Sequence, residues 1–136
     1  MNPSPLSRIL YVEDEEHIRA VAQIALEEVG GFTVALAGSG QEGVEKARTF
    51  LPDLILLDVM MPGMDGIATL RALKELPATS GIPVIFLTAK VQPKEVDAYR
   101  KLGALGVLSK PFDPMTLPDE LRTIWKQSPF SMTTGS

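Results

Sequence analysis

Short apolar runs alternate with segments of helical periodicity along most of the chain. The runs have the length of strands and cover residues 9–12, 32–36, 54–57, 82–87 and 105–108. The run at 54–57 is apolar at every position, which is typical of a strand that helices cover on both faces of a parallel sheet. The alternation therefore predicts an α/β fold of the doubly wound (βα)5 type, a three-layer sandwich around a parallel five-stranded sheet.

The segments between the runs predict five helices. We expect them at about residues 14–28, between Ser39 and Pro52, at 66–76, at 93–102 and from Pro114 onward. The first helix carries an apolar stripe at helical spacing, formed by Ile18, Val21, Ala22, Ala25 and Val29. Ser39 and Glu42 have the spacing of a capping box at the start of the second helix. Asp113, directly before Pro114, is expected to cap the last helix.

The periodic pattern fits one domain of ordinary size. In a chain of 136 residues we expect this domain at residues 7–127, with flexible tails rich in Ser, Pro and Thr at 1–6 and 128–136. No internal repeat and no second domain is visible.

Composition excludes several classes of function. The formal net charge of −4 argues against direct binding to nucleic acid, which requires a basic face. No stretch approaches the roughly 18–20 apolar residues of a membrane span, so we expect no membrane contact. The chain has no cysteine, which excludes a zinc–thiolate site and a thiol nucleophile and is compatible with a cytoplasmic location.

Polar side chains stand where the strand-like runs end. Glu13 and Asp14 follow the first run, Asp58 follows the third, Thr88 follows the fourth, and Lys110 follows the last through Ser109. Parallel strands bring their carboxyl ends to one edge of the sheet, where open α/β sheets place their chemistry. We therefore expect three carboxylates, a hydroxyl and an amine to converge there.

Three neighbouring carboxylates predict a bound cation. Each close pair repels by up to about 4 kcal/mol at an effective dielectric near 20. Oxygen ligands without His or Cys favour Mg²⁺, which also binds phosphate oxygens. Glu15 and Glu16 need no such role, because acids in the first turn of a helix meet its positive dipole end. We interpret His17 as a surface residue, because the chain has no second His and no Cys to share a metal with it.

These residues resemble, in order, the motifs of the receiver domain of two-component response regulators. The matching motifs are Glu13-Asp14, the segment from Asp58 to Gly66, Thr88-Ala89 and Lys110-Pro111-Phe112. The resemblance covers about residues 7–127. It implies a flavodoxin-like fold with the strand order 2-1-3-4-5.

The resemblance also implies a role for each site residue. Asp58 would accept a phosphoryl group from a phosphohistidine on a sensor histidine kinase or a phosphotransfer protein. Asp14, Asp58 and the backbone carbonyl of Met60 would bind Mg²⁺, with Glu13 acting through a water. Thr88 and Lys110 would hold the phosphoryl oxygens, and the signal would pass to a downstream effector protein. The peptide bond between Lys110 and Pro111 would be cis.

Two positions depart from the family's usual pattern. Glu13 stands where Asp is also common, which is compatible with a contact through water. Val107 stands where the family usually has Tyr or Phe. Because a β-branched side chain is stiff at χ1, we expect switching through the loop at 88–94 and the following helix rather than through Val107.

Three other functions were weighed against this interpretation. Haloacid-dehalogenase-like phosphatases need a second Asp two residues after the nucleophile as a general acid, and Met60 stands there, so we expect no enzyme beyond self-phosphorylation and autodephosphorylation. A flavodoxin-like flavin binder needs a phosphate loop after the first strand, where this chain has four acids. A degenerate receiver would lack key residues that are all present here. No output domain follows, so we expect a stand-alone receiver or one excised from a longer protein.

Overall fold

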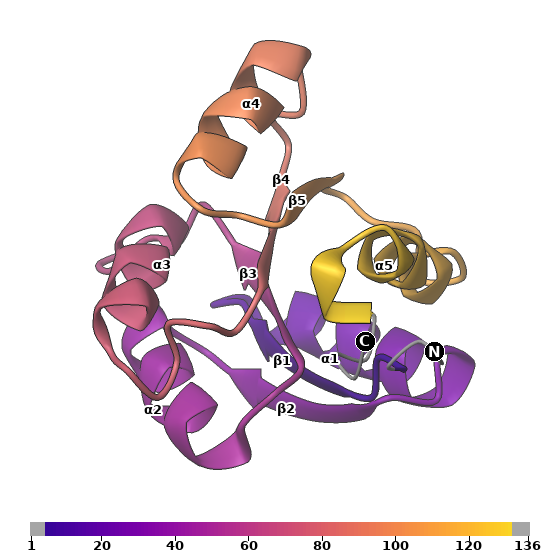
Figure 1. Ribbon diagram of the computed structural model, residues 1–136. Coiled ribbons are helices and arrows are strands. Elements are labelled where there is room, and N and C mark those ends of the chain that lie inside the picture. The colour runs from indigo at the N-terminus through magenta and orange to yellow at the C-terminus, as the bar shows by residue number, and fades with distance from the viewer. Residues whose placement is uncertain (1–4, 132–136) are drawn as a thin grey trace, which may run out of the picture.

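A parallel sheet of five strands forms the centre of the computed structural model, which describes residues 5–131 (Figure 1). The strands are β1 (Arg8–Val12), β2 (Thr33–Ala37), β3 (Leu54–Asp58), β4 (Val84–Thr88) and β5 (Gly106–Ser109). They lie in the order β2-β1-β3-β4-β5, and every neighbouring pair is parallel. The predicted fold class and the strand order that the resemblance implied are both confirmed.

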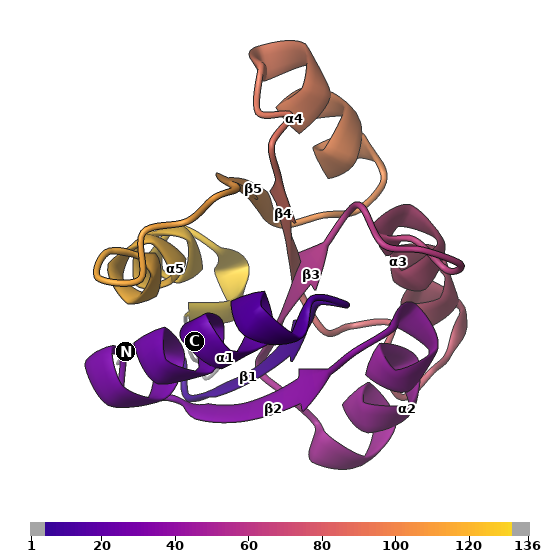
Figure 2. The same ribbon diagram turned by 180° about the vertical axis from the view of Figure 1, so that it is seen from behind.

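Helices cover both faces of this sheet. They are α1 (Glu16–Ile24), α2 (Gly40–Phe50), α3 (Gly66–Glu75), α4 (Pro93–Lys101) and α5 (Leu117–Lys126), with a π-helical turn η1 (Ala25–Val29) and a 3-10 turn η2 (Pro129–Ser131). Figures 1 and 2 show α1 and α5 on one face, α2 and α3 on the other, and α4 beside the edge formed by β4 and β5. Among the described residues, no helix has the length and apolar character needed to cross a membrane.

The sheet separates two apolar clusters. Leu54 and Leu56 pack with α1 and α5 residues on one face, whereas Ile55 and Leu57 pack with α2 and α3 residues on the other. Successive side chains of a strand point to opposite faces, so a strand covered on both sides needs apolar residues at every position. This explains the uninterrupted run at 54–57.

The first helix differs from the prediction in both its bounds and its apolar face. It begins at Glu16, and its second part is the π-helical turn η1, where the Gly30 amide donates to the carbonyl of Ala25 at 2.9 Å. A π turn bonds i to i+5 and so rotates later side chains relative to an α-helix. Leu26, four residues after the buried Ala22, is buried, whereas Val29 at the end of the turn is 44% exposed. Val21 is exposed to the same extent, so the expected stripe is wrong at its 21 and 29 positions.

Two predicted helix caps are only partly correct. Ser39 Oγ accepts from the Glu42 amide at 3.1 Å, but the Glu42 carboxylate accepts from the Gly38 amide and not from Ser39, so one half of the capping box forms. Asp113 does not cap α5, which begins at Leu117. Its carboxylate instead accepts from the Met115 amide at 2.9 Å, a local turn that competes with helix formation.

Packing contacts continue on both sides of residues 7–127, the boundaries expected from the sequence. Leu6, which we assigned to a flexible tail, is buried in the core. At the other end η2 packs back onto α5, where Phe130 stacks on Trp125 with ring centroids 6.1 Å apart and the buried Ser131 hydroxyl donates to the Lys126 carbonyl. The rest of the expected tails, residues 1–4 and 132–136, lies outside the described residues.

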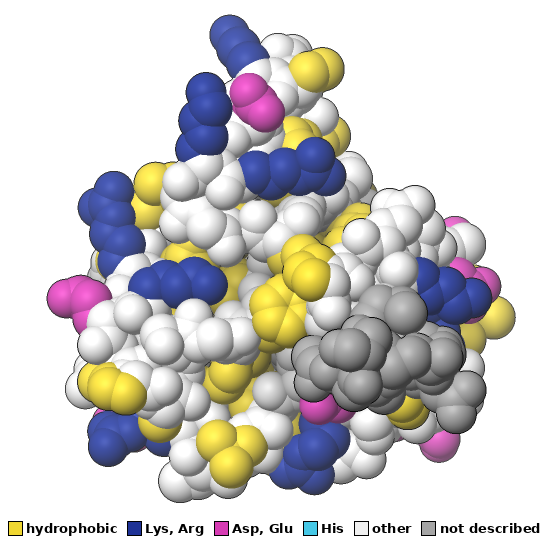
Figure 3. Space-filling model, in the orientation of Figure 1, with side chains coloured by type: hydrophobic (Ala, Val, Ile, Leu, Met, Phe, Trp, Pro, Cys, Tyr) yellow, Lys and Arg dark blue, Asp and Glu magenta, His cyan; other side chains and the backbone are white. Residues whose placement is uncertain are grey.

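Helix α4 is the least covered helix. None of its residues is buried, and Figure 3 shows Lys and Arg side chains spread over its surface. Its main apolar anchor is Tyr99, whose ring packs edge-on against Phe86 of β4 at 5.2 Å. A helix with so little buried apolar surface is held weakly compared with the rest of the domain.

Candidate functional site

The polar residues at the strand ends meet at one edge of the sheet. Carboxylate oxygens of Glu13, Asp14 and Asp58 lie within 4.8 Å of one another, and Lys110 reaches two of these three groups from the end of β5. The carboxyl ends of β1, β3 and β5 position these side chains, as expected for an open α/β sheet. The three carboxylates and the amine therefore meet as predicted, while the approach of the Thr88 hydroxyl and the chemical role of each residue stay predictions.

Most of these groups are inaccessible to solvent. Glu13 is 0%, Asp58 1% and Thr88 2% exposed, and only Asp14 and Lys110 are half-buried. A buried ionised carboxylate is strongly unfavourable unless it is paired and hydrogen-bonded. The number of ion-pair and hydrogen-bond partners available to each carboxylate therefore determines the electrostatics of the site.

Lys110 is the cation that these carboxylates share. Its Nζ donates to Oε1 of Glu13 at 2.7 Å and lies 3.2 Å from Oδ2 of Asp58. The second distance makes an ion pair, but its orientation does not make a hydrogen bond. Within the part of the chain that the structure describes, Oδ2 of Asp58 is the buried side-chain polar atom left without a hydrogen-bond partner. Such an oxygen is ready to receive another positive group.

The pKa shifts follow from the unequal sharing of Lys110 between Glu13 and Asp58. Burial and then the charge of Glu13 raise the pKa of Asp58 from 3.8 to about 6, although Lys110 opposes the shift. Burial also acts to raise the pKa of Glu13, but hydrogen bonds from Lys110 and the Glu15 amide outweigh it, and that pKa is lowered. Burial and then the hydrogen bond with Glu13 raise the pKa of Asp14. Lys110 and the Glu15 amide therefore favour the ionised form of Glu13, whereas burial and the charge of Glu13 disfavour the ionised form of Asp58.

The donor set fits a hard divalent cation. Three carboxylates face one ammonium, all of the candidate ligands are oxygens, and one buried oxygen lacks a hydrogen bond. Such ions take oxygen ligands and complete their shell with water or phosphate oxygens. The acid cluster could therefore hold a metal ion, and the apolar environment around it would strengthen the attraction.

The loop after β3 approaches the site closely. The Gly66 amide donates to the carbonyl of Val59 at 2.9 Å, and a Cβ at Gly66 would lie 2.5 Å from the carbonyl oxygen of Asp58. Only glycine permits this approach. Met60 lies in the same loop and is 70% exposed. The predicted role of its carbonyl as a metal ligand stays a prediction.

Thr88 and Lys110 are joined through the backbone. The Lys110 amide donates to the Thr88 carbonyl at 2.9 Å, and Thr88 Oγ1 accepts from the Lys90 amide at 3.1 Å. The peptide bond between Lys110 and Pro111 is cis, as the resemblance implied. The hydroxyl and the ammonium are therefore held at the ends of neighbouring strands.

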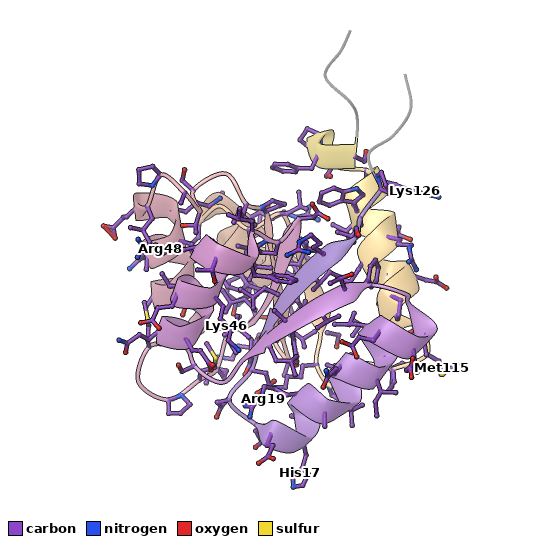
Figure 4. All side chains as sticks on the ribbon, turned by 90° about the horizontal axis from the view of Figure 1, so that it is seen from below. His17, Arg19, Lys46, Arg48, Met115 and Lys126 are labelled. Carbon is purple, nitrogen blue, oxygen red and sulfur yellow. The ribbon has the colours of Figure 1, made fainter. Side chains whose placement is uncertain are left out.

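Two residues of the site were not identified from the sequence. The buried Tyr11 hydroxyl donates to Oε1 of Glu13 at 3.2 Å. Arg19 of α1, labelled in Figure 4, donates through Nη1 to the backbone carbonyls of Glu13 at 2.7 Å and Asp14 at 3.0 Å. The position of Tyr11 two residues before Glu13 places both on one face of the strand, which is a usable signal. Arg19 has no comparable signal, because only the helix packing brings it to these carbonyls.

A small apolar pocket of about 240 Å³ opens beside Lys110. It is lined by His17, Ile18, Val21, Lys110, Pro111 and Phe112. His17 itself is exposed and points outward at the start of α1 (Figure 4), as expected for a surface residue. The pocket thus joins the face of α1 to the carboxyl-end site.

The fold and this cluster of residues define an open α/β domain with a polar site at the carboxyl ends of its strands, and comparison with known proteins gives its family. The family model of the response regulator receiver domain matches residues 9–122. The chain belongs to this family, which confirms the resemblance seen in its motifs.

Curated relatives are longer proteins. The transcriptional regulatory protein CseB of Streptomyces coelicolor is 36% identical over 121 residues, which cover 89% of this chain and 50% of the relative. The alkaline phosphatase synthesis transcriptional regulatory protein PhoP of Bacillus subtilis is 37% identical over 89% of this chain and 49% of the relative. The chain spans about half the length of these relatives. Their names describe gene regulation, and the expected absence of nucleic-acid contacts stays a prediction for this chain.

Solved structures of similar extent share the fold. The chemotaxis response regulator CheY4 of Vibrio cholerae superposes with a TM-score of 0.80 at 31% identity, covering 88% of this chain and 99% of that one. The receiver domain of a signal transduction histidine kinase from Syntrophus aciditrophicus superposes with a TM-score of 0.75 at 32% identity, covering 96% and 98%. Receiver domains of this size thus occur in proteins of different organisation.

Proposed function

We propose that this chain is the phosphoacceptor of a two-component phosphorelay, in which Asp58 receives a phosphoryl group from the phosphohistidine of a sensor kinase or phosphotransfer protein. The observation that carries the proposal is the buried Oδ2 of Asp58, which lacks a hydrogen bond and lies 3.2 Å from Lys110. A buried acceptor oxygen that lacks a hydrogen bond does not contribute to stability through hydrogen bonding. It does provide a nucleophile with a cation beside it.

The chemistry follows from the positions of the side chains. A carboxylate oxygen of Asp58 attacks phosphorus, a P–O bond forms, and the P–N bond of the phosphohistidine breaks. The leaving imidazole nitrogen keeps the electron pair of that bond and can take a proton from solvent. The Lys110 ammonium and the Thr88 hydroxyl, at the ends of β5 and β4, stabilise the negative charge on the transferring oxygens.

Mg²⁺ is the metal that we propose for the acid cluster. Asp14, Asp58 and the Met60 carbonyl would hold it directly, and Glu13 would act through a water. When bound, it supplies positive charge next to the phosphoryl oxygens. This assignment rests on the oxygen-only donor set of the cluster and on the family.

The chain is proposed to act only on its own phosphoryl group. An efficient phosphatase would need a proton donor for the leaving group two residues after the nucleophile, and the exposed Met60 occupies that position. The phosphorylated domain would signal to an effector protein, without binding nucleic acid itself, in the cytoplasm. The exposed helix α4 and the neighbouring β5 and α5 are the proposed responsive surface.

Incubation with acetyl phosphate and Mg²⁺ tests the acceptor. Intact mass and hydroxylamine lability should show one acyl phosphate on the wild-type chain and none on Asp58→Asn. Asp53→Asn is the matched control, because Asp53 lies just before β3, at the opposite end of the strand that Asp58 ends, and its carboxylate caps backbone amides there. A phosphoryl group on His17 or a serine, or an Asp58→Asn chain that is still modified, would contradict the proposal.

Thermal unfolding tests the metal. Because a ligand that binds only the folded state stabilises it, millimolar Mg²⁺ should raise the melting temperature of the wild-type chain. The increase should be smaller for Asp58→Asn, which loses a proposed ligand. A wild-type melting temperature that ignores Mg²⁺ would show that the acids do not form a metal site.

A further inference from the structure

Tyr11 places a hydroxyl inside the acid cluster. Its ring is completely buried in the apolar cluster beneath α1 and α5, between the neighbouring strand residues Leu36 and Leu56. Its hydroxyl donates to Oε1 of Glu13 at 3.2 Å. Close packing holds the ring in place, so the hydroxyl oxygen stays beside this carboxylate.

Oε1 of Glu13 has two donors, and only one of them can move. Lys110 donates to it at 2.7 Å on a long, half-buried side chain, whereas the Tyr11 hydroxyl is fixed by the core. The other carboxylate oxygen, Oε2, accepts from the Glu15 amide at 3.2 Å. Burial and then the charge of Glu13 raise the pKa of Tyr11, so its hydroxyl remains a donor.

Phosphorylation of Asp58 changes what Lys110 must bind. Its Nζ already lies 3.2 Å from Oδ2 of Asp58, and a phosphoryl group there would present new anionic oxygens to it. If Lys110 moves to these oxygens, it leaves Oε1 of Glu13, which is fully buried. A buried carboxylate oxygen without a donor is strongly unfavourable.

We propose that Tyr11 is a positioning residue for phosphoryl transfer, whose fixed hydroxyl keeps Oε1 of Glu13 hydrogen-bonded while Lys110 moves from that carboxylate to the phosphoryl group. The inference rests on the proposed function of Asp58. Tyr11 of β1 would stabilise the phosphorylated state selectively. In the unphosphorylated state it is less needed, because Lys110 also donates to Oε1 of Glu13.

The test compares Tyr11→Phe with Tyr99→Phe, since the chain has two tyrosines. Tyr99 lies on α4 and packs against Phe86, away from the acid cluster. Titrations followed by NMR would measure affinity for Mg²⁺ alone and for beryllofluoride, a phosphoryl mimic, in saturating Mg²⁺. Tyr11→Phe should weaken beryllofluoride binding about tenfold and change Mg²⁺ affinity by less than about twofold. Tyr99→Phe should change neither.

Two results would overturn the inference. Equal losses of both affinities in Tyr11→Phe would mean general damage to the pocket, and unchanged affinities would mean that the hydroxyl has no role.

If Tyr11→Phe unfolds, 3-fluorotyrosine in the Tyr99→Phe chain gives a single fluorine resonance from Tyr11. Its shift should be larger with Mg²⁺ and beryllofluoride than with Mg²⁺ alone, and equal shifts would also overturn the inference.

The wild-type chain separates this inference from the proposed function. Beryllofluoride binding that requires Mg²⁺ and is lost in Asp58→Asn supports the acceptor role of Asp58. If the wild-type chain does not bind in this way, the proposed function fails. If it does bind and Tyr11→Phe binds equally well, only the role of Tyr11 fails.

Discussion

At the amino ends of the strands the carboxylate of Asp53 is well paired, whereas at the carboxyl ends Asp58 keeps a buried oxygen without a hydrogen bond. Oδ2 of Asp53 accepts from the backbone amides of Ser7 at 3.1 Å and Arg8 at 2.8 Å. The Arg8 guanidinium in turn donates to the Phe50 carbonyl at 2.6 Å and lies 4.1 Å from the centre of the Phe50 ring. At this end of the sheet, the charged side chains of Asp53 and Arg8 thus hold neighbouring chain segments together.

The carboxyl end contains similar residue types in an unsatisfied arrangement. Lys110 pairs with two of the three carboxylates, Glu13 and Asp58, and the raised pKa of Asp58 reflects the shortage of positive charge. A local arrangement that lowers stability persists where function requires it. The comparison teaches that burial and charge alone do not identify a functional acid. What distinguishes Asp58 from Asp53 is the shortage of partners.

The largest effect is expected from Lys110→Ala without Mg²⁺. Removing the shared cation leaves Glu13 and Asp58 buried without a counter-charge, so the free energy of unfolding should fall by about 3 kcal/mol. Urea unfolding would measure this loss, and Mg²⁺ should restore part of it. Lys101→Ala is the control, because the exposed Lys101 pairs only with Asp97 on α4 and should matter by less than about 0.5 kcal/mol. Equal losses of stability in Lys110→Ala and Lys101→Ala would contradict the contrast between the carboxyl and amino ends of the sheet.

Asp58→Asn should stabilise the metal-free chain by about 2 kcal/mol at pH 7. Since the folded state raises the pKa of Asp58 from 3.8 to about 6, the folded state favours the protonated acid. The stability that the wild-type chain gains from protonated Asp58 is fully present below about pH 4 and is lost as the pH rises through 6. The difference between Asp58→Asn and wild type should therefore grow between these pH values and then level off. Urea unfolding across this range would show it, and a difference that does not vary with pH would refute it.

Asp53→Ala should destabilise the chain, whereas Asp58→Asn stabilises it, and the change in the free energy of unfolding should be smaller. It leaves the amides of Ser7 and Arg8 without their acceptor, which should lower the free energy of unfolding by about 1 kcal/mol. Phosphorylation by acetyl phosphate, measured by intact mass, should be unchanged. A loss of phosphorylation in this variant at a temperature where it is folded would show that the two ends are coupled.

An effect on stability as small as that of Asp53→Ala is expected at Val107. This strand valine is partly buried against the same cluster as Tyr99, so Val107→Ala should cost about 1 kcal/mol of stability. The NMR response of residues 89–102 to beryllofluoride should persist, because the weakly covered α4 and the loop before it are expected to move. A Val107 rotamer change coupled to Thr88 would contradict this expectation and would extend the functional end into β5.

The features that depend on local periodicity could be predicted from the sequence. Alternating runs and helical segments indicate the fold class, and the uninterrupted apolar run at 54–57 indicates a central strand. The positions of Glu13, Asp58 and Lys110 at run ends indicate one common edge. Strand order and the cis bond came from the resemblance to receiver domains.

Helix ends were predicted less well. The first helix ends in the π-helical turn η1, where Val29 is exposed, and α5 begins only at Leu117, after the turn at Asp113. In both places alternative hydrogen bonds of similar energy compete, and the packing of neighbouring elements selects one of them.

Only the tertiary structure decided how the charges of the site are shared. Lys110 reaches Glu13 across 97 positions of the chain, and it comes near Asp58 without forming a hydrogen bond to it. The sequence determined which groups stand at the strand ends. Which oxygen receives the ammonium, and which stays unpaired, depends on side-chain orientations that the crossovers and core packing impose, because hydrogen bonds require angles and distances that spacing along a chain does not specify.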